Sequence, residues 1–118
     1  MIKEQELKNK CTPEFIKWMC EYAEGFFING YMLVEYQEEI YDFDTAISKD
    51  KIFLLLIRRA VEGIKIIYSD PEKLWYNNIY GMQCFRFKNY QPEYLTQAEC
   101  AMLDCLLEIF AEQEGRDE

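Results

Sequence analysis

Histidine is absent from the sequence, and only five glycines and three prolines occur among its 118 residues. Without histidine, the Cys-His and Ser-His pairs of nucleophilic enzymes are excluded, unless a lysine or a carboxylate serves as the base. The glycines are scattered, so the chain has no glycine-rich loop that could bind a phosphate. An enzyme is therefore the less favoured class, and we predict no catalytic residues.

Long apolar runs are also lacking. The longest run, Ile52–Ile57, falls far below the ~20 residues that a membrane-spanning helix needs. The first ten residues, MIKEQELKNK, lack the apolar core of a secretory signal. We therefore expect a cytoplasmic protein that does not insert into a membrane.

Cysteine is present, but not in a pattern that indicates a metal or a disulfide framework. The count is odd and no CxxC spacing occurs, so we expect reduced and mostly buried thiols. A zinc site would need four of the cysteines, or carboxylates in their place. We predict no metal and no cofactor. The cysteines are Cys11, Cys20, Cys84, Cys100 and Cys105.

Basic residues are outnumbered by acidic ones, 13 to 22, which gives a net charge of −9. The acidity is concentrated in residues 26–50 (net −5) and 95–118 (net −6), and lysine and arginine do not recur in a pattern that would form a basic stripe. Direct nucleic-acid binding, which depends on neutralising phosphates, is therefore not expected. Residues 35–44 form either a site or a solvated acidic face, and the solvated face is favoured. Asp42-Phe43-Asp44 has the spacing of a calcium-loop start but lacks the later glycine and glutamate.

These features predict an α+β fold in a single domain, residues 1–118. The three predicted helices span about residues 13–24, 49–68 and 97–113. A small antiparallel sheet, made from a hairpin at about 26–36 and a strand at about 82–88, packs against them. The segments 1–11 and 114–118 are predicted to be frayed.

The central helix is predicted by the stretch KIFLLLIRRAVEGIKIIY, residues 51–68. Its apolar residues recur at helical spacing, although a buried strand from Ile52 to Ile57 is an alternative. Arg58 and Glu62 lie four residues apart and predict a surface ion pair. The face predicted to be buried contains Phe53, Leu56, Ile57, Ala60, Ile64, Ile67 and Tyr68.

Capping signals predict the starts of the other two helices. Thr12-Pro13-Glu14 supplies a capping hydroxyl, a proline at the first helical position and an acid in the first turn. Thr96 and Glu99 form a capping box before the C-terminal helix, in which Asp104, Glu108 and Glu112 are predicted to face away from the core.

The hairpin is predicted by Asn29-Gly30, which favours a two-residue type I′ turn. Phe26–Ile28 would then pair with Tyr31–Leu33 or residues beyond it. A helix from Tyr31 to Ile40 is the alternative. The acidic residues that follow are expected to form a loop.

Two segments carry a resemblance to a known group of proteins. LLLIRRAVEGI (Leu54–Ile64) and LTQAECAMLDCLLEIF (Leu95–Phe110) resemble segments of small uncharacterised proteins encoded in phages and prophages. The resemblance implies an accessory protein of a phage or mobile element, and it brings no activity or site residues with it.

Aromatic residues make up 16% of the chain, and many are tyrosines and tryptophans in predicted connections. Such residues suit a partner surface, or they cover the core of a small domain. The candidate binding residues are Trp75, Tyr76 and Tyr80. We expect a non-enzymatic protein-interaction or accessory protein with a protein partner or self-association. The alternatives are an acidic inhibitor or DNA mimic that binds a basic host protein, and a small-ligand binder or enzyme that uses carboxylates and tyrosines.

Overall fold

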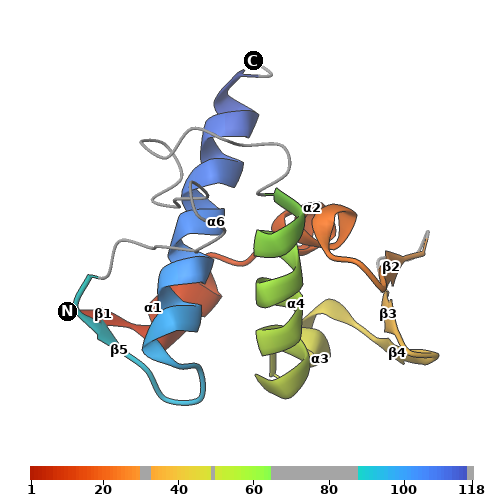
Figure 1. Cartoon of the computed structure of the whole chain (residues 1–118), viewed down its shortest axis with the longest axis horizontal. Coiled ribbons are helices and arrows are strands. Elements are labelled where there is room, and N and C mark those ends of the chain that lie inside the picture. Colours follow the sequence, from red (N-terminus) through yellow and green to blue (C-terminus); the bar gives the residue numbers. More distant parts are fainter. Residues whose placement is uncertain (30–32, 49, 65–87, 117–118) are drawn as a thin grey trace.

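The computed structural model describes residues 1–29, 33–48, 50–64 and 88–116. It confirms the α+β class: helices pack with a small three-stranded antiparallel sheet (Figure 1). The described residues form five helices rather than the three predicted. The two unforeseen helices are short and lie in segments expected to be frayed or looped. None of the helices in the described ranges could cross a membrane, because none is both long and apolar enough.

The N-terminal segment is ordered, contrary to the prediction that residues 1–11 fray. It forms the short strand β1 (Ile2–Lys3) and the helix α1 (Glu4–Asn9). β1 pairs in parallel with β5 (Tyr90–Gln91), and Leu7 is fully buried. The prediction failed because it weighed the polar composition of the segment and could not see its partners near residue 90.

Glu4 fastens this segment to the start of the C-terminal helix. One of its carboxylate oxygens accepts hydrogen bonds from three successive backbone amides, those of Glu93, Tyr94 and Leu95, at 3.0, 2.9 and 2.6 Å. The other oxygen lies 3.2 Å from the Lys8 ammonium. Burial alone raises the pKa of Glu4, but these hydrogen bonds outweigh it and leave the pKa below its ordinary value of 4.5.

Glu4→Gln is expected to lower the free energy of unfolding at neutral pH by about 2 kcal/mol, because a neutral amide binds three N–H donors less strongly than a carboxylate. The pH dependence should change as well. The unfolded chain protonates Glu4 at a higher pH than the folded chain, so the stability that Glu4 contributes is lost as pH falls through the folded pKa. Urea unfolding should be measured at about pH 7 and about pH 3.5. The free energy of unfolding should fall less between these two pH values in Glu4→Gln than in the wild type. Equal losses in the two proteins would contradict this role for Glu4.

The helix α2 (Pro13–Tyr22) begins where the sequence predicted. Thr12 accepts a hydrogen bond from the Phe15 amide at 3.2 Å, as the capping signal requires. The helix packs mainly on α4 (Asp50–Ile64) and also on α6 (Gln97–Arg116). Trp18 adds a 2.7 Å hydrogen bond from its indole nitrogen to the side chain of Gln113.

The helix α4 confirms the predicted central helix over residues 50–64 and excludes the alternative strand at Ile52–Ile57. Ile67 and Tyr68 lie outside the described residues. The predicted buried face is correct wherever it is described, because Phe53, Leu56, Ile57, Ala60 and Ile64 are all 3% exposed or less.

The helix α6, rather than α4, is the more enclosed one. Every residue from Glu99 to Leu106 is buried, whereas α4 leaves Arg58 and Glu62 exposed. The prediction that Asp104 faces away from the core is wrong: it is 8% exposed. The backbone of α6 remains helical to Arg116, beyond the predicted start of fraying at residue 114.

Buried acids on α6 are possible because distant residues neutralise them. Glu99 is 1% exposed and forms an ion pair with Arg58 of α4, although the sequence predicted Glu62 as the partner of that arginine. Asp104 accepts hydrogen bonds from the Lys88 ammonium and the Tyr90 hydroxyl, each at 2.8 Å. A buried carboxylate needs such partners, and none of these pairs follows from helix spacing.

The three-stranded sheet has the order β2-β3-β4 and is antiparallel throughout. Its strands are β2 (Phe26–Ile28), β3 (Val34–Tyr36) and β4 (Glu39–Tyr41). The predicted hairpin exists, but Ile28 pairs with Val34, so five residues separate the strands instead of two. The alternative of a helix over Tyr31–Ile40 is excluded, because β3 and β4 occupy its described part.

The tight two-residue turn lies in the second hairpin, at Gln37-Glu38. Both residues have positive φ, +50° and +68°, as a type I′ turn requires. The expected acidic loop after it instead forms β4 and the helix α3 (Phe43–Ser48). The predicted strand at about 82–88 falls almost wholly outside the described residues, and Lys88 itself is not in a strand.

Candidate functional site

The predicted binding residues Trp75, Tyr76 and Tyr80 lie outside the described residues. Most other aromatic residues of predicted connections belong to the core. Phe43 and Tyr90 are buried, and Tyr36 and Tyr41 pack against the core while partly exposed. Of the connection aromatics that the structure describes, only Tyr94 is largely exposed, at 61%, and the Lys8 ammonium lies 5.5 Å from the centre of its ring.

A different group of apolar side chains is exposed, on the three-stranded sheet. Phe27 is 63% and Ile40 58% exposed, and the pairing register places both beside Glu35 of the central strand. Residues in one register row share a face of a sheet, so the row reads Phe27–Glu35–Ile40 across all three strands. We call these three residues the outer sheet face.

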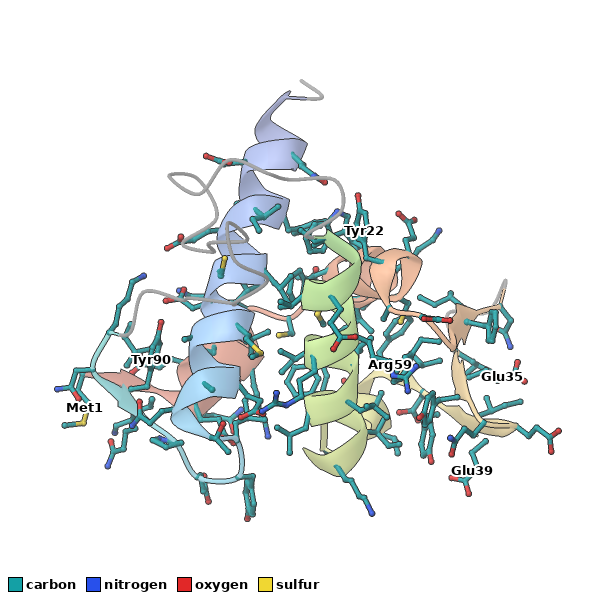
Figure 2. All side chains as sticks on the ribbon, in the orientation of Figure 1. Met1, Tyr22, Glu35, Glu39, Arg59 and Tyr90 are labelled. Carbon is teal, nitrogen blue, oxygen red and sulfur yellow. The ribbon has the colours of Figure 1, made fainter. Side chains whose placement is uncertain are left out.

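The opposite face of the sheet is fixed to the helices. Phe26 and Val34 are buried, and the Phe26 ring stacks on that of Tyr36 with 4.5 Å between ring centres. Arg59 of α4 lies between that helix and the sheet (Figure 2). Its guanidinium is 5.8 Å from the centre of the Tyr36 ring and donates a 2.9 Å hydrogen bond to the carbonyl oxygen of Glu24. The outer sheet face is therefore held in place from behind.

The acidic segment 35–44 passes through β3, β4 and the start of α3. Of its acids only Glu35 is in the register row of the outer sheet face, because Glu39 pairs with Tyr36 on the opposite side of the sheet. Figure 1 shows the sheet at one side of the molecule, beyond α4 and away from α6, and Figure 2 shows Glu35 and Glu39 at its outer boundary. Four of the five acids in the segment are exposed, and Glu35 is half-buried. The five are Glu35, Glu38, Glu39, Asp42 and Asp44. The segment thus joins negative charge to exposed apolar side chains.

Two of these acids also have local structural roles. Asp42 caps α3, because its carboxylate accepts a 2.6 Å hydrogen bond from the Thr45 amide, and the hydrogen bonds of Thr45 lower its pKa. Glu39 accepts a hydrogen bond from the Tyr41 hydroxyl, which raises the pKa of Tyr41. Among the described residues no group of three His, Cys, Asp or Glu side chains could hold a metal ion.

A cleft of about 560 Å³ lies between α1 and the C-terminal half of α6, and it contains the Lys88–Asp104 pair. The hydrogen bond to Asp104 raises the pKa of Lys88, and burial together with the same carboxylate raises that of Tyr90. Lys88 therefore stays charged and Tyr90 stays protonated at neutral pH. A general acid or base needs a pKa near the working pH, so this network is suited to stabilising the fold and not to transferring protons.

The four cysteines in the described residues are also poor nucleophiles. None of the four forms a disulfide, and burial raises the pKa of Cys11, Cys20 and Cys105 to about 12 and that of Cys100 to about 11. The reactive form of cysteine is the thiolate, which is scarce at neutral pH when the pKa is so high. The prediction of mostly buried thiols is confirmed for these four, although Cys11 is only partly covered.

Comparison with protein-family models, with curated proteins and with solved structures found no match to this chain. The functional argument therefore depends on the surface itself. The outer sheet face is the site that the sequence analysis did not single out, although one signal was present. Two adjacent phenylalanines in a short strand, Phe26 and Phe27, must point to opposite sides, so one of them had to be exposed unless a second layer covered it.

Proposed function

We propose that this chain is a non-enzymatic protein-interaction protein that binds a basic partner protein through the outer sheet face. The observation that carries the proposal is the register row Phe27–Glu35–Ile40, in which two exposed apolar side chains flank a carboxylate. Large apolar side chains that are rigidly held and solvent-exposed are typical of binding surfaces.

The charge around the face defines the partner. Glu35 lies on the face itself, Glu38, Glu39, Asp42 and Asp44 are exposed in the same segment, and the whole chain has a net charge of −9. Complementary charge speeds association and disfavours acidic competitors, while the apolar contacts contribute most of the affinity. We therefore expect a partner surface that combines lysine or arginine with apolar side chains. The resemblance of residues 54–64 and 95–110 to phage and prophage proteins is the reason to seek this partner among bacterial host proteins.

An acidic inhibitor or DNA mimic is the second candidate, favoured by the concentration of carboxylates in residues 35–44. The two candidates differ in what drives binding. A DNA mimic binds mainly through charge, so its affinity collapses as salt rises, whereas contacts of Phe27 and Ile40 persist in salt.

The proposal predicts that Phe27→Ser weakens capture of a specific host protein about tenfold or more, as expected when a central aromatic contact is lost. The immobilised chain would be exposed to bacterial lysate, the captured proteins identified and quantified by mass spectrometry, and the affinity of the identified partner measured by calorimetry. Because Phe27 is 63% exposed, its loss should leave the melting temperature nearly unchanged.

Tyr94→Ser provides a matched control, since Tyr94 is equally exposed but lies in the β5–α6 connection, away from the sheet. This variant should retain the partner. Equal capture by the wild type and Phe27→Ser would refute the proposed surface. Loss of binding in high salt, with no effect of Phe27→Ser, would favour the DNA mimic.

A further inference from the structure

The two hairpins of the sheet determine which backbone groups point toward its edges. In a hairpin closed by a two-residue type I′ turn, the residues that flank the turn form a hydrogen-bonded pair. The turn at Gln37-Glu38 therefore makes Tyr36 and Glu39 such a pair. Hydrogen-bonded and non-hydrogen-bonded pairs alternate along an antiparallel ladder, so Glu35 and Ile40 form a non-hydrogen-bonded pair.

The pairing of β3 with β2 leads independently to the same assignment of Glu35 and Ile40. The Asn29 amide donates to the Leu33 carbonyl at 3.2 Å, which makes these residues a hydrogen-bonded pair. Alternation then directs the backbone of Glu35 toward Phe27 of β2 and away from β4. It follows that the N–H and C=O groups of Ile40 point outward, toward the edge of β4 that pairs with no other strand in the described part of the chain.

The free edges of the sheet are not equivalent. Along β2, α2 packs against the strand, and the Phe26 amide already donates to the Ala23 carbonyl at 3.2 Å. β4 is the outermost strand in the opposite direction (Figure 1). Its central residue, Ile40, directs its backbone groups to this edge and is 58% exposed. Proteins usually protect such an edge with lysine, proline, other charged residues, a bulge or a short strand. β4 is three residues long and contains neither lysine nor proline, and its one charged group is the carboxylate of Glu39.

Charge decides what can occupy this edge. Glu38 precedes the strand, Glu39 lies on it, and Asp42 and Asp44 follow it, all of them exposed. A second copy of this chain would bring a matching row of carboxylates to the same edge, and like charges repel. A strand that carries lysine or arginine would instead place its cations beside these carboxylates. Apolar residues alternating with them would continue the row Phe27–Glu35–Ile40 across a fourth strand.

We infer that β4 accepts an extended basic segment of the partner protein as an added antiparallel strand, with the N–H and C=O groups of Ile40 making the new backbone hydrogen bonds. This is the strand-addition mode of peptide recognition, in which main-chain bonds supply affinity and alternate side chains supply specificity. The inference rests on the proposed function and specifies how the outer sheet face is used.

The test uses the full chain and a short synthetic peptide in which lysine and valine alternate. Titration followed by amide hydrogen exchange in NMR should show the exchange of the Ile40 amide slowing about tenfold or more at saturation, because that amide becomes hydrogen-bonded. Two further peptides serve as controls. One has the same composition with all lysines preceding all valines, and the other alternates glutamate with valine; both should bind about tenfold more weakly or worse.

Substitutions at Ile40 test the backbone directly. Ile40→Pro removes the outward N–H without removing a bond to β3, so it should abolish peptide binding while the fold is retained. Ile40→Val keeps the amide and a branched side chain and should bind within about threefold of the wild type. Tyr41→Pro removes an amide that faces β3 and should lower the melting temperature instead. The amide-exchange measurement uses the wild type, so it tests hydrogen bonding at Ile40 even if Ile40→Pro fails to fold.

Each contrary result overturns the inference in a distinguishable way. If the alternating peptide binds and the Ile40 amide exchanges as before, the partner contacts the face and not the edge, and the proposed function survives. Equal binding of the block peptide would mean attraction by charge alone. If light scattering shows a dimer and Ile40→Pro dissociates it, the occupant of the β4 edge is a second copy of this chain and not a basic segment of a partner. No binding of any peptide would reject the added strand, while the lysate experiment with Phe27→Ser tests the proposed function separately.

Discussion

Replacing Leu56 with aspartate is expected to unfold the protein. Leu56 is completely buried on the face of α4 that meets the core. The substitution removes the apolar contacts of the leucine and places a carboxylate among the buried apolar side chains of the core. Each effect is worth several kcal/mol, and a typical domain has a total stability of only about 5–15 kcal/mol. Circular dichroism during heating should show no cooperative transition for Leu56→Asp.

Lys51→Asp is the matched control for that experiment. It introduces the same side chain in the same helix, at an exposed position in the first turn, where a negative charge is favourable. This variant should melt within a few degrees of the wild type, as about 0.5 kcal/mol or less would imply. A Leu56→Asp protein that melts as cooperatively as the control would show that α4 does not bury this face.

Gly63→Ala is expected to destabilise the protein by about 2–4 kcal/mol, in the manner of an overpacked core. A Cβ atom added at Gly63 would lie only 2.0 Å from the carbonyl oxygen of Tyr22, where α4 crosses the end of α2. The obstacle is backbone, so it cannot rotate aside as a flexible side chain could, and the two helices would have to move apart. Chemical denaturation should therefore show a lower midpoint with an unchanged slope.

The sign of this effect is informative because helix propensity predicts the opposite. Alanine is favoured over glycine inside a helix by about 1 kcal/mol. Glu62→Ala provides the control, since Glu62 is the exposed neighbour of Gly63 in the same turn, and this change should be nearly neutral. An increase in stability for Gly63→Ala would mean that α2 and α4 are less closely packed than the structure shows.

The helices α2, α4 and α6 were predictable because their signals are local. Thr12 and Thr96 each accept a hydrogen bond from an amide three residues later, at 3.2 Å in both cases, as their capping patterns indicated. The buried face of α4 followed from apolar spacing. Both kinds of signal depend only on residues within one or two turns of helix, so they can be recognised without knowledge of the tertiary structure.

The remaining features depend on contacts between distant residues. The Asn29-Gly30 pair favours a two-residue turn, but the observed register places Phe26, Val34 and Tyr36 together on the inner side of the sheet. Burial of that set determined the register, because a shift by one residue would reverse every side chain. The tight turn formed at Gln37-Glu38, which contains no glycine from which it could have been predicted.

The buried acids were missed for a related reason. Sequence periodicity places Asp104 on the polar side of its helix, and only the positions of Lys88 and Tyr90 reveal that this side is covered. The candidate site was predictable only in part. The acidic segment 35–44 was recognised as either a site or a solvated face, whereas the exposure of Phe27 and Ile40 required the register of three strands.

Glu4 has a consequence for the order in which the chain can fold. Its amide partners lie 89–91 positions further along the polypeptide. During synthesis the ribosome releases the N-terminal segment long before those partners emerge, and closing so large a loop is entropically unfavourable. We therefore expect the β1–α1 segment to dock late, after α2, the sheet and α4, whose contacts join residues that are closer in the sequence.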